Sequence, residues 1–138
     1  YKSNLGTMKT KNAVKESEKV ISAFEVKTPG TSTLATALSG GNQQKFVVGR
    51  ELEDDPSLLI ASQPTRGIDI GAQALIWEKL RKSRDEGLSV LLISADLEEL
   101  IGLSDRIIVF YQGKLVKELD AKNVTPEDLG GYMTGLKT

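Results

Sequence analysis

Apolar and polar positions follow two different periods along this chain of 138 residues. Short apolar runs at Leu58–Ala61 and Ser89–Ser94 have the length and composition of strands that are buried on both faces. Apolar positions at helical spacing predict helices over about Lys11–Phe24 and Ile70–Arg84. Because strands alternate with helices, the pattern predicts an α/β fold with a parallel sheet and flanking helices.

The residues at the ends of these segments support the same arrangement. Asp69, Asp96 and Thr125 each stand where a helix N-cap is expected, directly before a helical pattern. Two strand-like runs, Arg106–Tyr111 and Lys114–Leu119, flank the pair Gln112-Gly113, which predicts an antiparallel hairpin near the C-terminus. The run at 28–33 has the composition of a loop.

Composition removes several classes of chemistry. The chain has no cysteine and no histidine, so it has no disulfide, no thiol nucleophile and no imidazole base or metal ligand. Its formal net charge of −1 gives no reason to expect nucleic acid as a partner. No apolar run approaches the length of a membrane span. Nothing in the sequence resembles a metal cluster or a nucleophile triad.

The run Leu38-Ser39-Gly40-Gly41-Asn42-Gln43-Gln44-Lys45 carries the strongest candidate chemistry. A serine and two glycines at the start of a helix predict a phosphate site, because glycine allows close approach and free helix N–H groups favour an anion. The serine hydroxyl would add a donor. A serine N-cap on an ordinary surface helix is the alternative. The candidate nucleotide-binding residues are Ser39, Gly40, Gly41, Asn42 and Gln43.

The octet resembles the signature motif of ATP-binding cassette (ABC) transporters, and its NQQK ending is similar to the form found in sugar and nucleoside importers. The resemblance continues in register through Pro64–Asp69, Val90–Ser94 and Asp105–Val109, and covers about residues 38 to 120. It implies a partial P-loop NTPase (ABC ATPase) domain. Residues 1–53 would be part of a helical subdomain that ends in the signature helix, and residues 54–138 the C-terminal part of the ATPase core.

A P-loop is missing from this sequence. The pattern Gly-x-x-x-x-Gly-Lys-Ser/Thr wraps the phosphates of a nucleotide. The only Gly-Lys pair is Gly113-Lys114, with Ile108 five positions before it and Leu115 after it, so the pattern fails at both ends. The family places its P-loop before the signature. We therefore expect the chain to be a piece of a longer protein and to be inactive by itself.

Three positions depart from the resemblance. The family pattern after the apolar strand is Asp-Glu-Pro-Thr, in which the aspartate is linked to Mg²⁺ and the glutamate activates water; here Ser62 and Gln63 occupy those two positions. Ala95 stands where the family often has a histidine that contacts the γ-phosphate. Glutamine cannot accept a proton, although it could still orient water. We therefore expect a degenerate catalytic site, with no metal ligand of its own.

The resemblance also implies how such a site would work. Paired cassettes place each signature over the P-loop of the other, with Asp69 in the interface loop. This chain would then be part of the second cassette of an importer that uses ATP and Mg²⁺. By itself, the chain would bind neither ATP nor Mg²⁺ tightly. The expected partners are the other cassette, transmembrane permease subunits and, indirectly, an external solute-binding protein, at the cytoplasmic face of the plasma membrane and without nucleic acid.

Two other interpretations remain open. The losses at Ser62, Gln63 and Ala95 also fit a regulatory or binding module that uses the ABC fold without catalysis. A soluble ABC protein acting on ribosomes or DNA is the third interpretation. The sequence Arg66-Gly67-Ile68-Asp69 differs from the pattern usual in ribosome-acting members, and the chain has none of the heptads of DNA-acting members.

Overall fold

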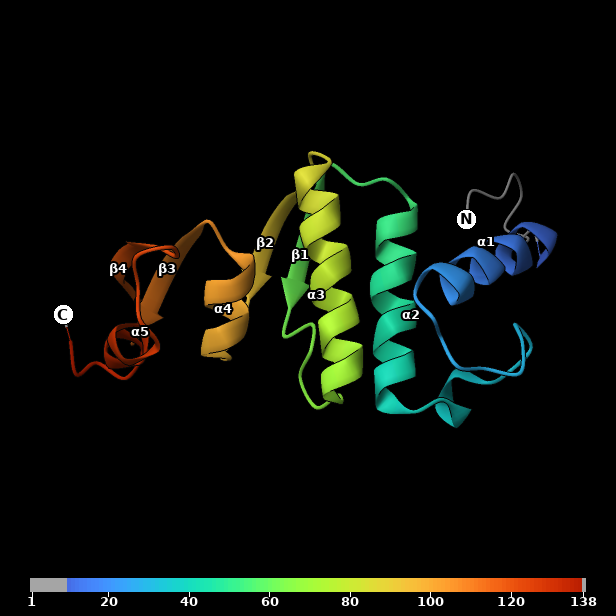
Figure 1. Ribbon diagram of the computed structural model, residues 1–138, viewed down its shortest axis with the longest axis horizontal. Helices are drawn as coiled ribbons and strands as arrows, with labels where there is room; N and C mark the ends of the chain where they lie inside the picture. The colour runs from blue at the N-terminus through green and yellow to red at the C-terminus, as the bar shows by residue number, and fades with distance from the viewer. Residues whose placement is uncertain (1–9, 138) are drawn as a thin grey trace. The chain divides into compact units, whose positions relative to one another are not determined.

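The computed structural model describes residues 10–137 and contains helices and strands in the predicted order (Figure 1). The start of the predicted portion 1–53 lies outside the described residues. The elements are α1 (Thr10–Ala23), a 3-10 turn (Ala35–Ala37), α2 (Gly40–Glu53), β1 (Leu58–Ser62), α3 (Ile70–Asp85), β2 (Ser89–Ile93), α4 (Leu97–Leu103), β3 (Arg106–Tyr111), β4 (Lys114–Asp120) and α5 (Pro126–Met133).

The chain forms two compact units. The first, here called the helical unit, comprises Tyr1–Leu59 and Pro64–Ser89, and contains α1, α2 and α3. The second, the strand unit, comprises Ile60–Gln63 and Val90–Thr138. These units follow the contacts within the chain, and the division into portions 1–53 and 54–138 stays a prediction.

In the helical unit, α1 packs closely on α2 at a glycine. A Cβ added to Gly49 would lie 2.7 Å from side-chain atoms of both Val20 and Phe24, so only glycine fits there. The helices α2 and α3 lie side by side with their N-termini at the same end (Figure 1). The buried stripe of α3 is Ala72, Ile76 and Leu80, which recur every fourth residue and point to one side. This packing brings the starts of α2 and α3 together.

The strands form two separate pairs. Parallel pairing of β1 with β2 follows from two hydrogen bonds, since Ser89 N–H donates to the Ser57 carbonyl before both strands and Gln63 N–H donates to the Ile93 carbonyl after both. The strands β3 and β4 form the predicted antiparallel hairpin. Its turn residues Gln112 and Gly113 both have positive φ, of 48° and 75°, as a two-residue hairpin turn requires.

The core of the strand unit lies between the hairpin and the helices α4 and α5. Its buried members are Leu100, Ile107, Val109, Ala121 and Leu129. In Figure 1, α5 lies against the β3–β4 hairpin. Leu92 of β2 packs against the same cluster, which joins the two strand pairs through side chains.

The expectation that the strands are buried on both faces is wrong for this chain. Alternate residues of β1 and β2 are half exposed, with values of 53% for Leu58, 61% for Ile60, 52% for Leu91 and 50% for Ile93. The physical reason is that within residues 10–137 the packing buries only one row of each strand.

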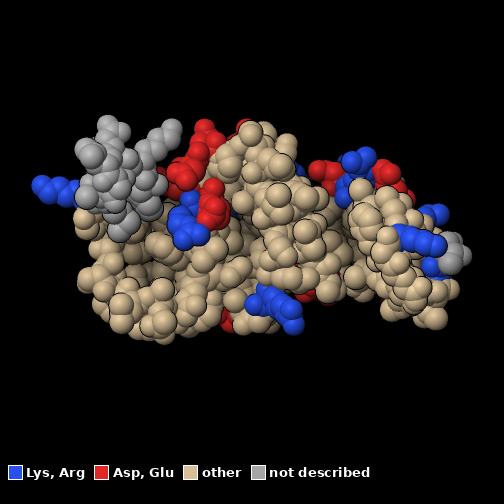
Figure 2. Space-filling view, turned by 180° about the vertical axis from the view of Figure 1, so that it is seen from behind, with Lys and Arg blue, Asp and Glu red and all other residues tan. Residues whose placement is uncertain are grey.

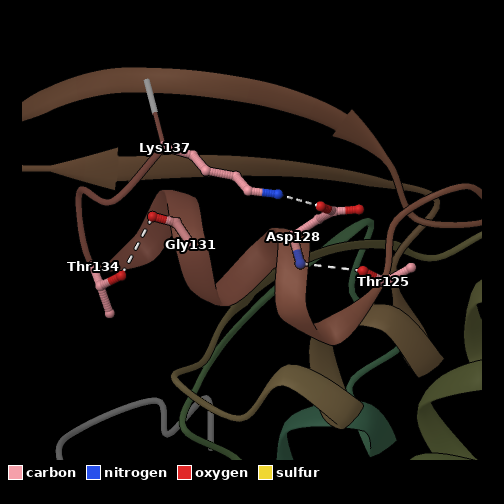
Figure 3. A network of polar contacts seen from close by, with 5 residues as sticks. All are labelled: Thr125, Asp128, Gly131, Thr134 and Lys137. Atoms are coloured by element: carbon pink, nitrogen blue, oxygen red, sulfur yellow. Dashed lines mark hydrogen bonds and ion pairs between the residues drawn. The ribbon is translucent and has the colours of Figure 1, made fainter.

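A polar network fixes the chain after α5 (Figure 3). Thr125 caps the helix by accepting the Asp128 N–H at 3.1 Å, and the Thr134 hydroxyl donates to the carbonyl oxygen of Gly131 at 3.3 Å. The Lys137 ammonium pairs with the Asp128 carboxylate. This hydrogen bond lowers the pKa of Asp128 and raises the pKa of Lys137. The network holds the C-terminal turn against the helix that precedes it.

Candidate functional site

The start of α2 is built as a capped helix mouth. Ser39 has extended backbone angles, and its Oγ accepts hydrogen bonds from the Asn42 side-chain amide at 2.9 Å and the Asn42 N–H at 3.4 Å. Because Oγ acts as the acceptor in both bonds, the hydroxyl hydrogen is not used by either. The N-cap role of Ser39 is therefore confirmed, and the hydroxyl can still donate to a ligand.

The side chains of Asn42 and Gln43 hold the chain around this mouth. The Asn42 Oδ1 accepts the Lys27 N–H at 2.8 Å, and the Gln43 Nε2 donates to the Leu38 carbonyl at 2.9 Å. Both side chains thus have partners within the protein. Their nucleotide-binding role stays a prediction, and they would have to bind the nucleotide while keeping these hydrogen bonds or after breaking them. The Lys45 Nζ lies 3.4 Å from the Glu25 carbonyl oxygen and adds a further tie to the same loop.

The two glycines of the motif do different things. Gly41 is buried, and a Cβ there would lie 2.9 Å from the Asp69 Oδ2 and 3.2 Å from the Ala72 Cβ. Gly40 is exposed, and a Cβ there would meet no atom within 4 Å. From the sequence, both glycines were predicted to let a ligand come close to the backbone. In the structure only Gly40 has open space beside it, while Gly41 serves the packing of α2 on the start of α3.

Asp69 links the two helix starts. Its carboxylate caps α3 by accepting the Ala72 N–H at 2.9 Å, as predicted, and it also lies against Gly41. The Ala72 N–H is the largest cause of a lowered pKa for Asp69, with smaller contributions from the N–H groups of Asp69 and Gly71 and from the Lys45 charge. The carboxylate is therefore ionised at neutral pH.

The helix mouth suits a phosphate group. The first N–H groups of α2, those of Gly40 and Gly41, come before the point at which helical carbonyls become available as partners. The N-terminal end of a helix carries partial positive charge, and the N-termini of α2 and α3 lie together (Figure 1). The Ser39 hydroxyl adds a neutral donor. The chemistry available from the Ser39 hydroxyl and the N–H groups of Gly40 and Gly41 is therefore binding and orientation of an anion.

A second set of candidate residues meets where β1 and β2 end. Gln63 has a positive φ of 50°, and its N–H donates to the Ile93 carbonyl at 2.7 Å. That hydrogen bond places Gln63 beside the segment that leads to Ala95. The Ser94 Oγ then accepts the Asp96 N–H at 3.0 Å, and Asp96 caps α4. The structure thus brings the predicted positions at the strand ends to one edge.

The residues at this edge do not suit a magnesium ion. Ser62 is exposed at the end of β1 and offers a neutral hydroxyl, and Gln63 offers a neutral amide, whereas a hard cation favours anionic oxygen. Within residues 10–137, no group of three acidic side chains is placed to hold a metal ion. Gln63 cannot accept a proton here, because an amide cannot act as a general base at neutral pH.

Charge is spread over the surface in both signs. On the face in Figure 2, lysine and arginine side chains are scattered and lie close to acidic ones instead of forming a continuous basic surface. Among the helices that the structure describes, none has the length and apolar character needed to cross a membrane.

Comparison with curated proteins identifies similar sequences. The chain is 44% identical over 133 residues to the guanosine import ATP-binding protein NupO of Bacillus subtilis, covering 96% of this chain and 26% of that protein. It is 48% identical over 120 residues to the glucose import ATP-binding protein TsgD13 of Haloferax volcanii, covering 86% of this chain and 22% of that protein. The chain therefore spans about a quarter of the length of these relatives. No protein-family model matches it.

Solved structures show the same fold. The ATP-binding cassette MJ0796, in a dimer bound to ADP and phosphate, aligns with a TM-score of 0.72 at 24% identity over 87% of this chain and 52% of that chain. A second match is the inward-facing conformation of a putative metal-chelate type ABC transporter. It aligns with a TM-score of 0.76 at 16% identity, over 96% of this chain and 53% of that one. At these identities the likeness shows the fold alone. Together with the relatives, it shows that over its own length the chain has the fold of part of an ATP-binding cassette (ABC) ATPase and resembles sugar and nucleoside import ATP-binding proteins.

Proposed function

We propose that this chain is part of the ATP-binding component of an ABC importer, which couples ATP binding and hydrolysis to the uptake of nucleosides or simple sugars. Relatives named for guanosine and glucose import support both solute classes. The importer would use ATP with Mg²⁺. It would sit at the cytoplasmic face of the plasma membrane, bound to transmembrane permease subunits and served indirectly by an external solute-binding protein.

Within that importer, the mouth of α2 would close over the terminal phosphate of ATP held by the P-loop of a partner cassette. The observation that carries this role is the difference between the two signature glycines. Gly41 is fixed against Asp69 and Ala72, while Gly40 is exposed with open space beside it. A rigid helix start with a bare backbone at its tip suits contact with a ligand that comes from another chain or domain.

The other predicted site of this chain would bind ATP without hydrolysing it well. Neutral side chains stand at the strand-end positions Ser62 and Gln63, and the methyl group of Ala95 cannot donate a hydrogen bond to a phosphate. A cassette pair with one complete site and one degenerate site would follow, and this chain would belong to the second cassette. The chain by itself would be inactive because it lacks a P-loop.

The test is a bulky substitution at the open glycine in the complete transporter. Gly40→Val should reduce ATP hydrolysis and solute uptake by about 100-fold or more, because a branched side chain would stand where the phosphate is bound. Gly30→Val is the matched control, since Gly30 also has no atom within 4 Å of an added Cβ but lies in the loop before α2. The control should keep its activity.

Uptake that is unaffected by Gly40→Val, with the protein folded, would remove the signature role. The same experiment also tests the alternative that the protein is a regulatory or binding module without catalysis. The neutral residues Ser62 and Gln63 are the argument for that alternative. A module of that kind would lose binding of its partner but would show no ATP hydrolysis in the complete protein before any substitution.

A further inference from the structure

The side chain of Asn42 makes a hydrogen bond that capping of α2 does not require. Asn42 is the third residue of this helix, whose N-cap is Ser39. In a capping box, the side chain at this position reaches back and accepts the backbone N–H of the cap. Here the Asn42 side-chain amide donates instead to the Ser39 Oγ at 2.9 Å. The same Oγ already caps the helix by accepting the Asn42 N–H. The additional bond therefore acts on the hydroxyl itself.

The loop after α1 determines which end of this amide faces the serine. The Lys27 N–H donates to the Asn42 Oδ1 at 2.8 Å. Because the oxygen is the acceptor of an amide side chain, this bond leaves the NH2 group on the side of Ser39. The loop is itself anchored, since Val26 is buried and its N–H donates to the Ile21 carbonyl at 3.0 Å. The orientation of the Asn42 side chain is therefore set from outside α2.

Two donors on the Ser39 oxygen restrict where its hydrogen can point. A serine hydroxyl has one hydrogen and two lone pairs. Both bonds from Asn42 use lone pairs of the Ser39 Oγ, so the hydrogen is directed away from Asn42. Ser39 is exposed, and so is the next residue, Gly40, which has open space beside it. The hydroxyl is therefore held as a donor to a group outside α2 before a ligand binds.

We propose that Asn42 is a positioning residue, which holds the Ser39 hydroxyl as a preformed donor for the terminal phosphate of a nucleotide. The inference rests on the function proposed above for the mouth of α2 and names the residue that prepares it. Donors that already point at the place of an anion need no reorganisation during the reaction, and this is what makes them effective. Asn42 acts through Ser39, and the loop at Lys27 acts through Asn42.

Two substitutions at position 42 separate this role from a structural one. Asn42→Asp keeps an oxygen for the Lys27 N–H but presents a second oxygen to Ser39, so the hydroxyl would donate to the carboxylate and be lost to the phosphate. The helix should stay stable, because a carboxylate in the first turn interacts favourably with the N-terminus. Asn42→Ala removes the acceptor of the Lys27 N–H, while the Ser39 hydroxyl stays free to turn towards a phosphate.

In the complete transporter, ATP hydrolysis should fall by about 100-fold for Asn42→Asp and by less than about 10-fold for Asn42→Ala. The urea midpoint of unfolding should follow the opposite order, with Asn42→Ala below the wild type and Asn42→Asp equal to it or above it. Asn123→Asp is the matched control, since its amide donates to Asp120 at 2.8 Å beyond β4, and it should leave hydrolysis unchanged. A structural role predicts one order for activity and stability, and such agreement would overturn the proposal.

A carboxylate also repels a phosphate directly, and a double-mutant cycle with Ser39→Ala separates this effect from the loss of the donor. Ser39→Ala alone should reduce hydrolysis by about 100-fold. In that background Asn42→Asp should cost less than about 10-fold, because the hydroxyl on which Asn42 acts is already absent. Effects of the two substitutions that simply multiply would overturn this inference alone. Hydrolysis at the wild-type rate in Ser39→Ala would overturn the proposed function of the α2 mouth, and the inference with it.

Discussion

The mouth of α2 and the ends of β1 and β2 are two polar sites that differ in how closely their side chains match the pattern of ABC cassettes. At the mouth, Ser39 keeps its cap, Gly41 keeps its fit against Asp69, and the sequence follows the family pattern. At the strand ends the backbone is ordered by the bond from Gln63 N–H to the Ile93 carbonyl, yet the side chains that would do chemistry are neutral. The backbone at the strand ends is therefore ordered although Ser62 and Gln63 carry no charge.

The largest expected effect comes from restoring the strand-end groups. The triple variant Ser62→Asp, Gln63→Glu and Ala95→His should raise ATP hydrolysis by about 100-fold in a transporter whose other site has been disabled, because a positioned general base typically contributes at least that much. The measurement is phosphate release by the complete transporter in the presence of Mg²⁺.

Gln112→Glu offers a matched control for the added charge. Gln112 is the other glutamine with a positive φ, of 48° against 50° for Gln63, and it lies in the hairpin turn. It should leave hydrolysis unchanged. If the triple variant binds ATP but remains as slow as its parent, the neutral side chains are not what limits this site. If the parent already hydrolyses ATP at a normal rate, the site is not degenerate.

A second comparison lies within the signature itself. Gly41→Val should destabilise the protein by about 1 to 3 kcal/mol, because a branched side chain would collide with Asp69 and Ala72 in a closely packed contact. Gly40→Val should leave stability nearly unchanged, since open space surrounds that position. The check is the urea midpoint of unfolding for each variant. Equal midpoints for the two variants would mean that the packing of α2 on the start of α3 is not what requires glycine.

The sequence predicted these elements well where a local signal fixed them. The N-caps Ser39, Asp69 and Asp96 are confirmed because each cap depends on a bond to an N–H two or three residues away. The hairpin turn at Gln112-Gly113 is confirmed for a similar reason, since its type is set by two residues.

Properties that depend on distant residues could not be predicted in the same way. The difference between buried Gly41 and open Gly40 depends on Asp69. This residue is 28 positions beyond Gly41 and lies next to it only in the folded helical unit. The exposure of one row of side chains in β1 and β2 could not be predicted either, because an apolar run predicts burial but does not reveal which residues cover it.

The smallest predicted effect concerns the charge of Asp69. The Ala72 N–H lowers the pKa of this carboxyl group in the folded state. Its contribution to stability is therefore complete at pH values above the pKa in the unfolded chain, and is lost as the pH falls through the lower pKa of the folded state. Asp69→Asn keeps a capping oxygen without a charge. The wild type should accordingly be slightly more stable than Asp69→Asn at about pH 6, and this advantage should shrink towards about pH 3.

Urea midpoints measured for both proteins across this pH range provide the test, and Asp105→Asn serves as a control for removal of an exposed carboxylate from the loop before β3. Since all other carboxyl groups are shared, the difference between wild type and Asp69→Asn isolates Asp69. A difference that stays constant with pH would show that the cap works through geometry alone. A shrinking difference would show instead that the ionised carboxylate, held between Gly41 and the start of α3, stabilises the same helix starts that form the predicted phosphate site.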